Sequence, residues 1–333
     1  MPAFRTALAS LALACCASAS ALADPQLADF SYPYPVQTYA FRSQGQALSM
    51  AYMDVQPTQP NGKTIMLLHG KNFCGATWEE TIRSLRDAGY RLVVPDQIGF
   101  CKSTKPQTYQ FSLHQLAANT RELLDTLKVE RPIVMGHSMG GMLAMRYALM
   151  YPHDTGALVL VNPIGLEDWK AKGVPLATID ELYASEQRTN FEGIKRYQQS
   201  TYYAGQWQPA YDRWVAMLAG MYQGEGGRLV AWNQAQTSDM ILSQPVVYEL
   251  EHIAVPTLLL IGEKDTTAIG KNRAPPEAAK ALGNYPVLAR ETEARIKGST
   301  LVTFPELGHS PQVQDPARFN ATLIEHLRKL PQG

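Results

Sequence analysis

The stretch Gly136-x-Ser138-x-Gly140 places one serine between two glycines, directly after a short apolar run. Strand-like residues precede Ser138 and a helical pattern continues to about Met150, so we expect a sharp strand-to-helix turn at the serine. Such a turn strains the serine backbone and exposes its hydroxyl, and side chains at positions 136 and 140 would collide with neighbouring elements. The pattern predicts a nucleophilic serine, with the amide of Met139 at a helix N-terminus ready to stabilise an oxyanion.

A serine hydroxyl is a poor nucleophile at neutral pH, so it needs an imidazole base and a carboxylate that orients the imidazole. Asp265 follows the apolar run 257–262, and His309 follows the run 300–305. The chain order Ser138, Asp265, His309 places each residue after a predicted strand, where an open α/β sheet binds its ligand. We expect these three residues to form a catalytic triad. Asp168, after the run 157–162, is the alternative acid.

The elements that must position these residues are short continuous apolar runs, which are typical of strands buried on both faces of a parallel sheet. The runs are 64–70, 91–96, 132–138, 157–162, 257–262 and 300–305. Ahead of them, alternating residues over 36–55 predict an antiparallel hairpin. Helical patterns follow at 78–88, 112–129 and 316–330, the first with Thr77 and Glu80 as an expected capping box. The alternation predicts a doubly wound, mostly parallel α/β sheet.

About ninety residues separate two of these runs, and they contain helical patterns but few strand patterns. A loop of that length is improbable, so we expect an inserted helical lid over 164–250, between core segments 24–163 and 251–333. The insertion is rich in tyrosine and tryptophan. Most of these rings are expected to form its small core, and some, including Trp207, are expected to face the active-site cleft.

The N-terminus resembles an export signal. Arg5 precedes an alanine-rich apolar stretch that ends in Ala21-Leu22-Ala23. This pattern predicts a signal peptide over 1–23 and a mature protein in the periplasm or outside the cell. The stretch is too short to span a bilayer, so no stable membrane insertion is expected after cleavage. A lipoprotein signal ending at Cys15 or Cys16 is the alternative, and it matches poorly.

Composition excludes several classes of partner. The 333 residues are 45% hydrophobic, and 30 Lys and Arg balance 30 Asp and Glu. A soluble globular protein follows, and without a basic run neither nucleic acid nor an anionic membrane surface is expected as a partner. No clustered Cys/His spacing occurs, so no catalytic metal and no cofactor are expected. The sequence does not indicate an oligomeric state.

Taken together, these motifs resemble the α/β-hydrolase superfamily. The matching stretches are LLHG at 67–70, PDQIGFCKS at 95–103, GHSMGG at 136–141, GEKD at 262–265 and GHSPQ at 308–312. The resemblance covers nearly the whole mature sequence and implies that fold, the lid and the triad. It also implies that the amide of Lys71, after the His-Gly pair, is the second oxyanion donor, and that His69 and Asp96 are structural.

Residues beside this loop are further candidates. Asn72 and Phe73 are expected to contact substrate, although a loop-stabilising role suits Asn72 equally well. The resemblance also places the loops that carry Cys74 and Cys101 side by side, and in an oxidising compartment the two can form a disulfide. Two free buried thiols are the alternative.

The sequence therefore predicts a serine hydrolase that cleaves an ester-type carbonyl of a small molecule through an acyl-enzyme intermediate. Serine rather than aspartate at position 138 argues against haloalkane dehalogenases and epoxide hydrolases, which the fold also contains. A lactonase, a carbon–carbon bond hydrolase, an aminopeptidase and a perhydrolase remain alternatives within the fold. A ligand-binding protein that has kept the triad is the alternative from another class.

Overall fold

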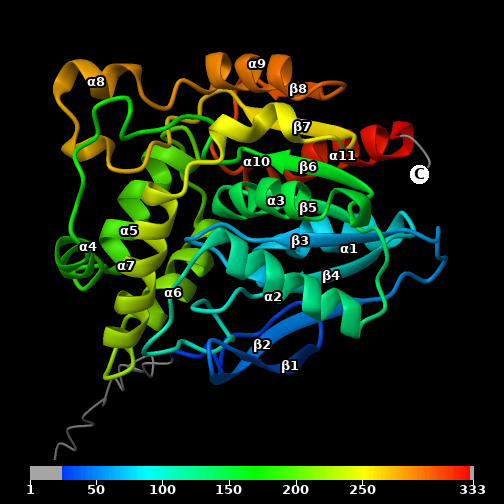
Figure 1. Ribbon diagram of the computed structural model, residues 1–333, viewed down its shortest axis with the longest axis horizontal. Coiled ribbons are helices and arrows are strands. Elements are labelled where there is room, and N and C mark those ends of the chain that lie inside the picture. The colour runs from blue at the N-terminus through cyan, green and yellow to red at the C-terminus, as the bar shows by residue number, and fades with distance from the viewer. Residues whose placement is uncertain (1–24, 331–333) are drawn as a thin grey trace, which may run out of the picture.

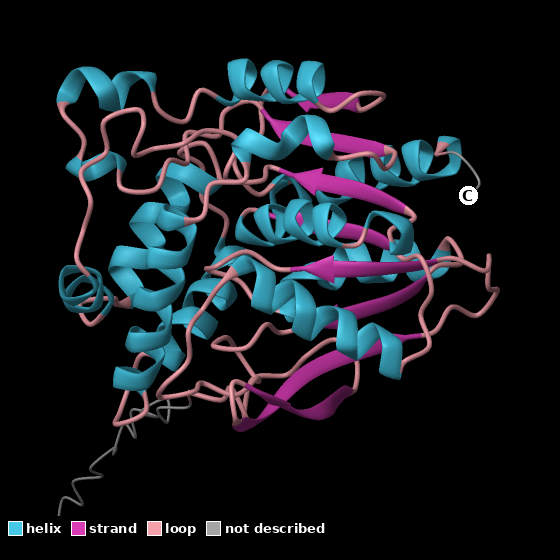
Figure 2. Ribbon diagram, in the orientation of Figure 1, coloured by secondary structure: helices cyan, strands magenta, loops and turns pink. Residues whose placement is uncertain are grey.

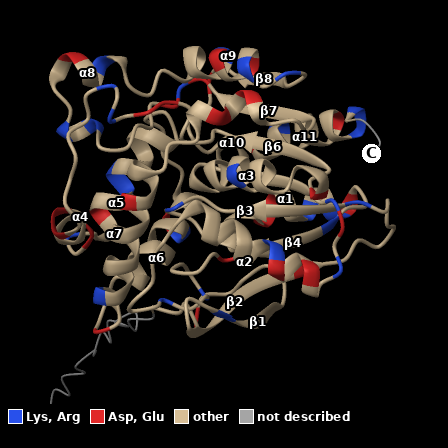
Figure 3. Cartoon of the chain, viewed as in Figure 1, with Lys and Arg blue, Asp and Glu red and all other residues tan. Residues whose placement is uncertain are grey.

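The structure is a computed structural model that describes residues 25–330. The predicted signal peptide, 1–23, lies outside the described residues. Within them, every helix is too short or too polar to cross a membrane. Lys and Arg are interspersed with Asp and Glu over the helices and loops (Figure 3), in line with the balanced composition.

An eight-stranded sheet forms the centre of the protein, in the order β1-β2-β4-β3-β5-β6-β7-β8 (Figure 1). The hairpin β1–β2 is antiparallel, β2 pairs antiparallel with β4, and all later pairs are parallel. The predicted fold class is confirmed, and each predicted strand is present. The strands are β1 Val36–Ser43, β2 Gln46–Val55, β3 Thr64–Leu68, β4 Arg91–Pro95, β5 Ile133–His137, β6 Ala157–Val161, β7 Thr257–Gly262 and β8 Thr300–Phe304.

Helices cover both faces of the sheet because the central strands are apolar on both sides. In β3, Met66 and Leu68 belong to one buried cluster with α2, α3 and α9, whereas Ile65 and Leu67 belong to a second with α1 and α11. The helices are α1 Glu79–Asp87, α2 Leu113–Thr126, α3 Met139–Met150, α4 Ile179–Glu186, α5 Phe191–Tyr197, α6 Asp212–Met221, α7 Gly227–Ser243, α8 Pro276–Ala281, α9 Tyr285–Arg295, α10 Pro311–Gln314 and α11 Pro316–Lys329.

The start of α1 differs from the prediction. A 3₁₀ turn, Gly75–Trp78, precedes the helix, so Thr77 lies inside helical backbone and cannot cap it. Its hydroxyl donates to the carbonyl of Cys74 at 2.6 Å, and Glu80 pairs with Arg83 instead. The expected capping box is therefore wrong, because the sequence pattern does not distinguish a cap from a preceding turn. Ser112 and Asp315 do cap α2 and α11.

Between β6 and β7 the chain forms α4, α5, α6 and α7, which gather at the end of the sheet toward which the strand arrows point (Figure 2). Buried side chains of this insertion, such as Tyr203 and Trp214, join the same cluster as α2 and α3. The ring of Tyr203 stacks on Tyr211 with centroids 3.9 Å apart. The inserted helices thus share one apolar core with a face of the sheet and cover the carboxyl ends of its strands.

Candidate active site

Ser138 occupies the strained turn between β5 and α3. Its φ of 57° and ψ of −121° lie outside the common regions for a residue with a side chain. A Cβ at position 136 would lie 2.0 Å from the Gly140 carbonyl oxygen, and one at position 140 would lie 2.2 Å from that of Leu68. The two glycines are therefore required by close backbone contacts, which hold the serine at the tip of the turn.

Asp265 and His309 meet at the same end of the sheet. Oδ2 of Asp265 lies 2.6 Å from Nδ1 of His309, and both side chains are fully buried. Asn162 donates to the same oxygen at 2.9 Å, and the amide of Thr267 donates to Oδ1 at 2.8 Å. The carboxylate is thus held from three sides and fixes the orientation of the imidazole.

The other ring nitrogen of His309, Nε2, is buried and has no hydrogen-bond partner among residues 25–330. The neighbour of Ser138 in the chain, His137, brings the histidine loop against the serine turn. Its Nε2 lies 2.8 Å from the carbonyl oxygen of His309, and the two rings are 4.8 Å apart. The His309 loop thus contacts the residue that precedes the strained serine, and His309 Nε2 is left without a partner in the described chain.

The structure does not bring Asp168 to this site. One of its carboxylate oxygens accepts the amides of Lys170 and Ala171, and the other accepts the hydroxyl of Tyr248. These bonds make Asp168 the cap of a surface turn. The alternative acid considered from the sequence therefore has no contact with His309.

The loop after β3 runs beside the serine. A Cβ at Gly70 would lie 3.0 Å from that of Ser138, so Lys71, the expected oxyanion donor, adjoins the nucleophile. Met139, the other expected donor, is the first residue of α3, where an amide has no partner within the helix. Beneath this loop His69 accepts the amide of Gln97 at 3.0 Å. Burial lowers the pKa of His69, which suits a neutral structural ring.

The side chain of Lys71 points to the insertion. Its ammonium lies 2.7 Å from Oε1 of Glu186 at the end of α4, and each side chain is 16% exposed. The other oxygen of Glu186 accepts the hydroxyl of Tyr222 at 2.7 Å. Sequence reasoning missed Glu186 and Tyr222, because no local pattern links them to a loop more than a hundred residues away.

Asn72 and Phe73 both contact the insertion through Tyr202. The amide nitrogen of Asn72 donates to the Tyr202 hydroxyl at 2.9 Å. The ring of Phe73 lies 5.6 Å from that of Tyr202 and 5.6 Å from that of His137. Nothing in the sequence distinguished Tyr202 from the other aromatic residues of the insertion.

Trp207 lies elsewhere. Its indole donates to Asp212 at 3.2 Å, and its ring packs against Tyr203 and Tyr211 with the Lys195 ammonium 4.9 Å from its centroid. This is the packing of a core residue within the insertion. The expectation that Trp207 contacts substrate finds no support in this geometry.

A cavity of about 440 Å³ opens between the loop after β3 and the inserted helices. Lys71 and Asn72 line its core side, and Glu186, Tyr197 and Tyr222 are among the residues that line its other walls. Ser138, which is 5% exposed, is not part of the lining. The cavity thus reaches the loop beside the nucleophile. Asn72 on its wall is hydrogen-bonded to Tyr202, whose ring lies 4.7 Å from that of His309.

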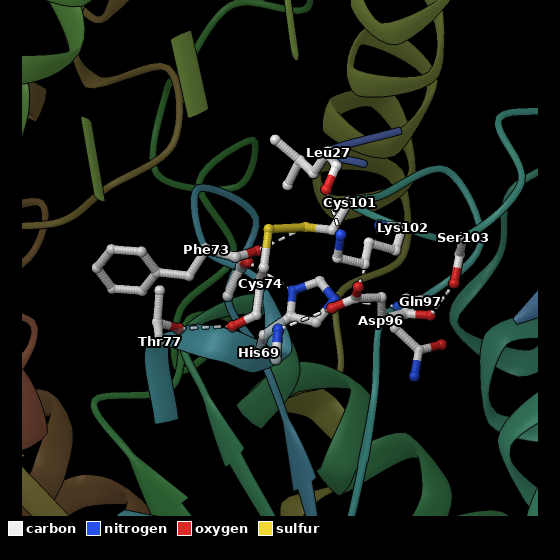
Figure 4. The surroundings of a disulfide bond; sticks show 12 residues. Leu27, His69, Phe73, Cys74, Thr77, Asp96, Gln97, Cys101, Lys102 and Ser103 are labelled. Carbon is white, nitrogen blue, oxygen red and sulfur yellow. Dashed lines mark hydrogen bonds between the residues drawn. A yellow bond between two sulfur atoms is a disulfide. The ribbon is translucent and has the colours of Figure 1, made fainter. Parts of the chain in front are cut away.

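Cys74 and Cys101 form a disulfide with a Cα–Cα distance of 5.8 Å. Figure 4 shows that it joins the loops after β3 and β4, close to His69 and Asp96. Asp96 accepts the amides of Gly75 and Lys102, one from each loop. Cys74, Cys101 and Asp96 are also the one group in the described chain with the residue types of a metal site, but sulfurs bonded to each other are not thiolate ligands.

Residues 63–316 of the chain match the protein family that is described as the alpha/beta hydrolase fold. A solved structure from Pseudomonas aeruginosa PAO1, described as a probable hydrolytic enzyme, is 60% identical, with a TM-score of 0.90 over 91% of this chain and 97% of that one. An esterase from Exiguobacterium antarcticum, 20% identical, matches with a TM-score of 0.68 over 88% of this chain and all (100%) of its own. At that identity the likeness shows the fold alone.

Among curated proteins, 2-hydroxy-6-oxo-6-phenylhexa-2,4-dienoate hydrolase from Comamonas testosteroni is 29% identical over 138 residues. Those residues are 40% of this chain and 48% of that protein, so the match spans about half of the relative. The family match over most of the chain, with the strand order and the serine turn, decides the assignment. The chain belongs to the alpha/beta hydrolase fold family.

Proposed function

We propose that the protein is a serine hydrolase that cleaves an ester-type carbonyl of a small molecule through an acyl-enzyme intermediate. The observation that carries the proposal is the 2.6 Å bond between Asp265 and His309, which leaves Nε2 of His309, within the described chain, without a partner in a loop that contacts the residue before the strained Ser138. Acyl transfer by serine requires a base with a fixed orientation and, in this fold, a serine on the sharp turn between a strand and a helix.

In this mechanism Nε2 of His309 accepts the Ser138 proton while Oγ attacks the carbonyl carbon. Asp265 stabilises the imidazolium that forms, and the amides of Lys71 and Met139 donate to the oxyanion. The intermediate collapses, the imidazolium protonates the leaving alcohol, and an acyl-enzyme remains on Ser138. Water, deprotonated by the same nitrogen, then attacks the acyl carbon to form a second tetrahedral intermediate. As this collapses and the acid leaves, the imidazolium returns the proton to Ser138 Oγ.

The inserted segment is proposed to act as a lid that determines which substrates reach Ser138. Support comes from the cavity of about 440 Å³, large enough for a medium-sized substrate, and from the inserted residues that line it. Export to the periplasm or the exterior is part of the same proposal. It is supported by the signal-like N-terminal sequence and by the Cys74–Cys101 disulfide, a bond typical of oxidising compartments.

Carbon–carbon bond cleavage is the second candidate, because the relative from Comamonas testosteroni is named as a hydrolase of an oxo-dienoate. The same triad can serve this reaction. A panel of nitrophenyl esters of increasing chain length, assayed beside a lactone, an aminoacyl amide and an oxo-dienoate, separates the candidates. Turnover of the dienoate well above that of every ester would replace the ester proposal.

The direct test of the proposal is labelling with a fluorophosphonate probe, followed by peptide mapping. We expect the label on Ser138, and Ser138→Ala should lose the label and at least about 10⁴-fold in kcat. Ser243→Ala, at an exposed position at the end of α7, is the matched control and should keep both. Labelling of any other serine, or stoichiometric binding of esters without turnover, would reject a Ser138 hydrolase.

A further inference from the structure

Tyr202 lies directly over the catalytic histidine. Its ring centroid is 4.7 Å from the His309 ring, at an angle of 39°, and 5.6 Å from that of Phe73. The residue ends a π-helical turn, Gln198–Tyr202, of the inserted segment and is buried. Turns of this rare type are frequent at functional sites. The insertion therefore contributes an aromatic ring to the immediate surroundings of the proposed base.

Backbone contacts hold this turn in place. The amides of His309 and Ser310 donate to the carbonyls of Thr201 and Tyr202 at 3.4 and 3.3 Å. The backbone of Gly308 approaches so closely that a Cβ there would lie 2.5 Å from the Tyr202 carbonyl oxygen. The position of the Tyr202 ring is thus set by main-chain bonds and ring packing. Its hydroxyl is not needed to dock the turn.

Among the described residues, the Tyr202 hydroxyl has one hydrogen-bond partner and does not donate a hydrogen bond of its own. It accepts a hydrogen bond from Asn72 Nδ2 at 2.9 Å, and its own proton has no acceptor within residues 25–330. Burial, with a smaller contribution from neighbouring Tyr197, raises the pKa of Tyr202 well above its usual value of 10. The phenol therefore stays protonated at neutral pH and offers a buried donor.

The loop that carries Asn72 connects this hydroxyl to the proposed oxyanion site. Asn72, which orients the hydroxyl, directly follows Lys71, whose amide is the proposed second oxyanion donor, and the same loop adjoins Ser138 at Gly70. The side-chain amide of Asn72 donates to Tyr202, so the donor that we expect a substrate to meet beside this loop is the Tyr202 hydroxyl. The carbonyl oxygen of a substrate, as it gains negative charge, could accept the hydrogen bond that the Tyr202 hydroxyl does not donate within the described chain.

We propose that Tyr202 is a further catalytic residue, whose hydroxyl donates a hydrogen bond to the oxyanion of the tetrahedral intermediate, with Asn72 as its positioning residue. The inference rests on the proposed serine mechanism and adds a side-chain donor from the insertion to the two backbone amides. No proton is transferred from the phenol. The bond forms as the carbonyl oxygen gains charge and weakens when the intermediate collapses.

The decisive variant is Tyr202→Phe, which keeps the ring over His309 and removes only the hydroxyl. Tyr203→Phe is the matched control, because the neighbouring hydroxyl is also buried, has no partner in the described chain, and lies on a ring stacked against Tyr211. Burst kinetics with nitrophenyl acetate separate acylation from deacylation. Both steps pass through a tetrahedral oxyanion, so both report on the donor.

We expect Tyr202→Phe to slow acylation and deacylation by a similar factor of about 100, with little change in KM. Nitrophenyl and less acidic phenyl leaving groups should show the same factor, because the donor acts on the carbonyl oxygen. Tyr203→Phe should retain the wild-type rates. A loss confined to acylation and growing with leaving-group basicity would instead assign the phenol to the leaving oxygen and overturn the proposal.

Asn72→Ala supplies a second, independent test that also serves if Tyr202→Phe folds poorly. It should lower both rate constants by about tenfold in the wild type, the effect of one hydrogen bond, and cause no further loss in Tyr202→Phe. Wild-type kcat in Tyr202→Phe, or in Asn72→Ala if the former is unfolded, rejects the donor role. Failure of the wild type to label at Ser138 would reject the underlying mechanism instead.

Discussion

His309 Nδ1 and Asp265 Oδ2 are 2.6 Å apart in a site where neither side chain is exposed to solvent. The two residues come from loops after β7 and β8, which are neighbours in the sheet. Asn162, at the end of β6, donates to the same carboxylate oxygen and so ties a third strand to the pair. Three adjacent strands therefore fix the tautomer and direction of one imidazole.

Replacing Asp265 by Asn should lower kcat by about 10⁴-fold, because the imidazole loses the carboxylate that orients it and stabilises its charged form. Asp168→Asn should have little effect, since that carboxylate only caps a turn and accepts from Tyr248. Ester turnover by the two purified variants checks the ranking. Equal losses, or a larger loss for Asp168, would contradict the assignment of the acid.

The sheet and the proposed triad could be predicted because their signals are local in the sequence. Each parallel strand is a short, mostly apolar run, and Ser138, Asp265 and His309 each follow one of them. The expected burial on both faces is wrong for β8, because it is the edge strand and only Phe304 is buried there. The glycines at 136 and 140 are needed because a Cβ at either position would lie about 2 Å from a backbone oxygen, and their spacing around Ser138 is visible in the sequence.

The lid side of the site could not be predicted in the same way. Asn72 contacts Tyr202 and Lys71 contacts Glu186 across 130 and 115 residues of sequence. These contacts depend on how the inserted helices pack against the loop after β3. The hydrophobic periodicity of the sequence does not report that packing. Trp207 shows the limit most clearly, because an aromatic residue of the insertion can fill its core as well as face a substrate.

Gly140→Ala should destabilise the protein by at least about 3 kcal/mol, because the new Cβ would meet the Leu68 and His69 carbonyl oxygens at 2.2 and 2.6 Å. Gly220→Ala in α6 is the control. Its Cβ would meet nothing within 4 Å, and alanine should stabilise that helix by about 0.5 to 1 kcal/mol. Urea unfolding of both variants measures the difference. Similar free energies of unfolding would show that the turn tolerates a side chain.

Removing the disulfide with Cys74→Ala and Cys101→Ala should lower the free energy of unfolding by about 3 to 4 kcal/mol, given the separation of 27 residues. The bond also tethers the loop that carries Lys71, so the rate of fluorophosphonate labelling should fall in the variant. Peptide mapping of the exported protein without reductant must first recover the two cysteines linked. Separately alkylated Cys74 and Cys101 peptides would contradict the bridge.

The ion pair between Lys71 and Glu186 should couple the core to the insertion. A double-mutant cycle with Lys71→Met and Glu186→Gln is expected to give a coupling energy of about 1 to 2 kcal/mol, because both side chains are only 16% exposed. The same cycle on Lys280 and Glu277, a pair that is 73% and 86% exposed, should give less than about 0.5 kcal/mol. Equal couplings in thermal or urea unfolding would show that the Lys71–Glu186 pair adds no link between the core and the insertion.

Acidification should destabilise the protein through His69 and His137. Burial is the largest cause that lowers the pKa of both rings, and the nearby His309 lowers that of His137 further. Above the unfolded pKa of about 6.5 both rings are neutral in both states and contribute nothing to the pH dependence. Below it the unfolded chain takes up protons that the folded protein does not, so the free energy of unfolding falls as pH falls.

The expected slope between pH 6.5 and 5.5 is positive and has an upper limit of about 2.7 kcal/mol per pH unit, since each ring contributes at most about 1.4 kcal/mol. Urea unfolding at pH 7.5, 6.5 and 5.5 measures it within a range where most carboxylates stay ionised. His69→Gln keeps an acceptor for the Gln97 amide and should reduce the slope, whatever its effect on stability at pH 7.5. A free energy of unfolding that stays constant from pH 7.5 to 5.5 would show that neither ring is held neutral in the folded protein.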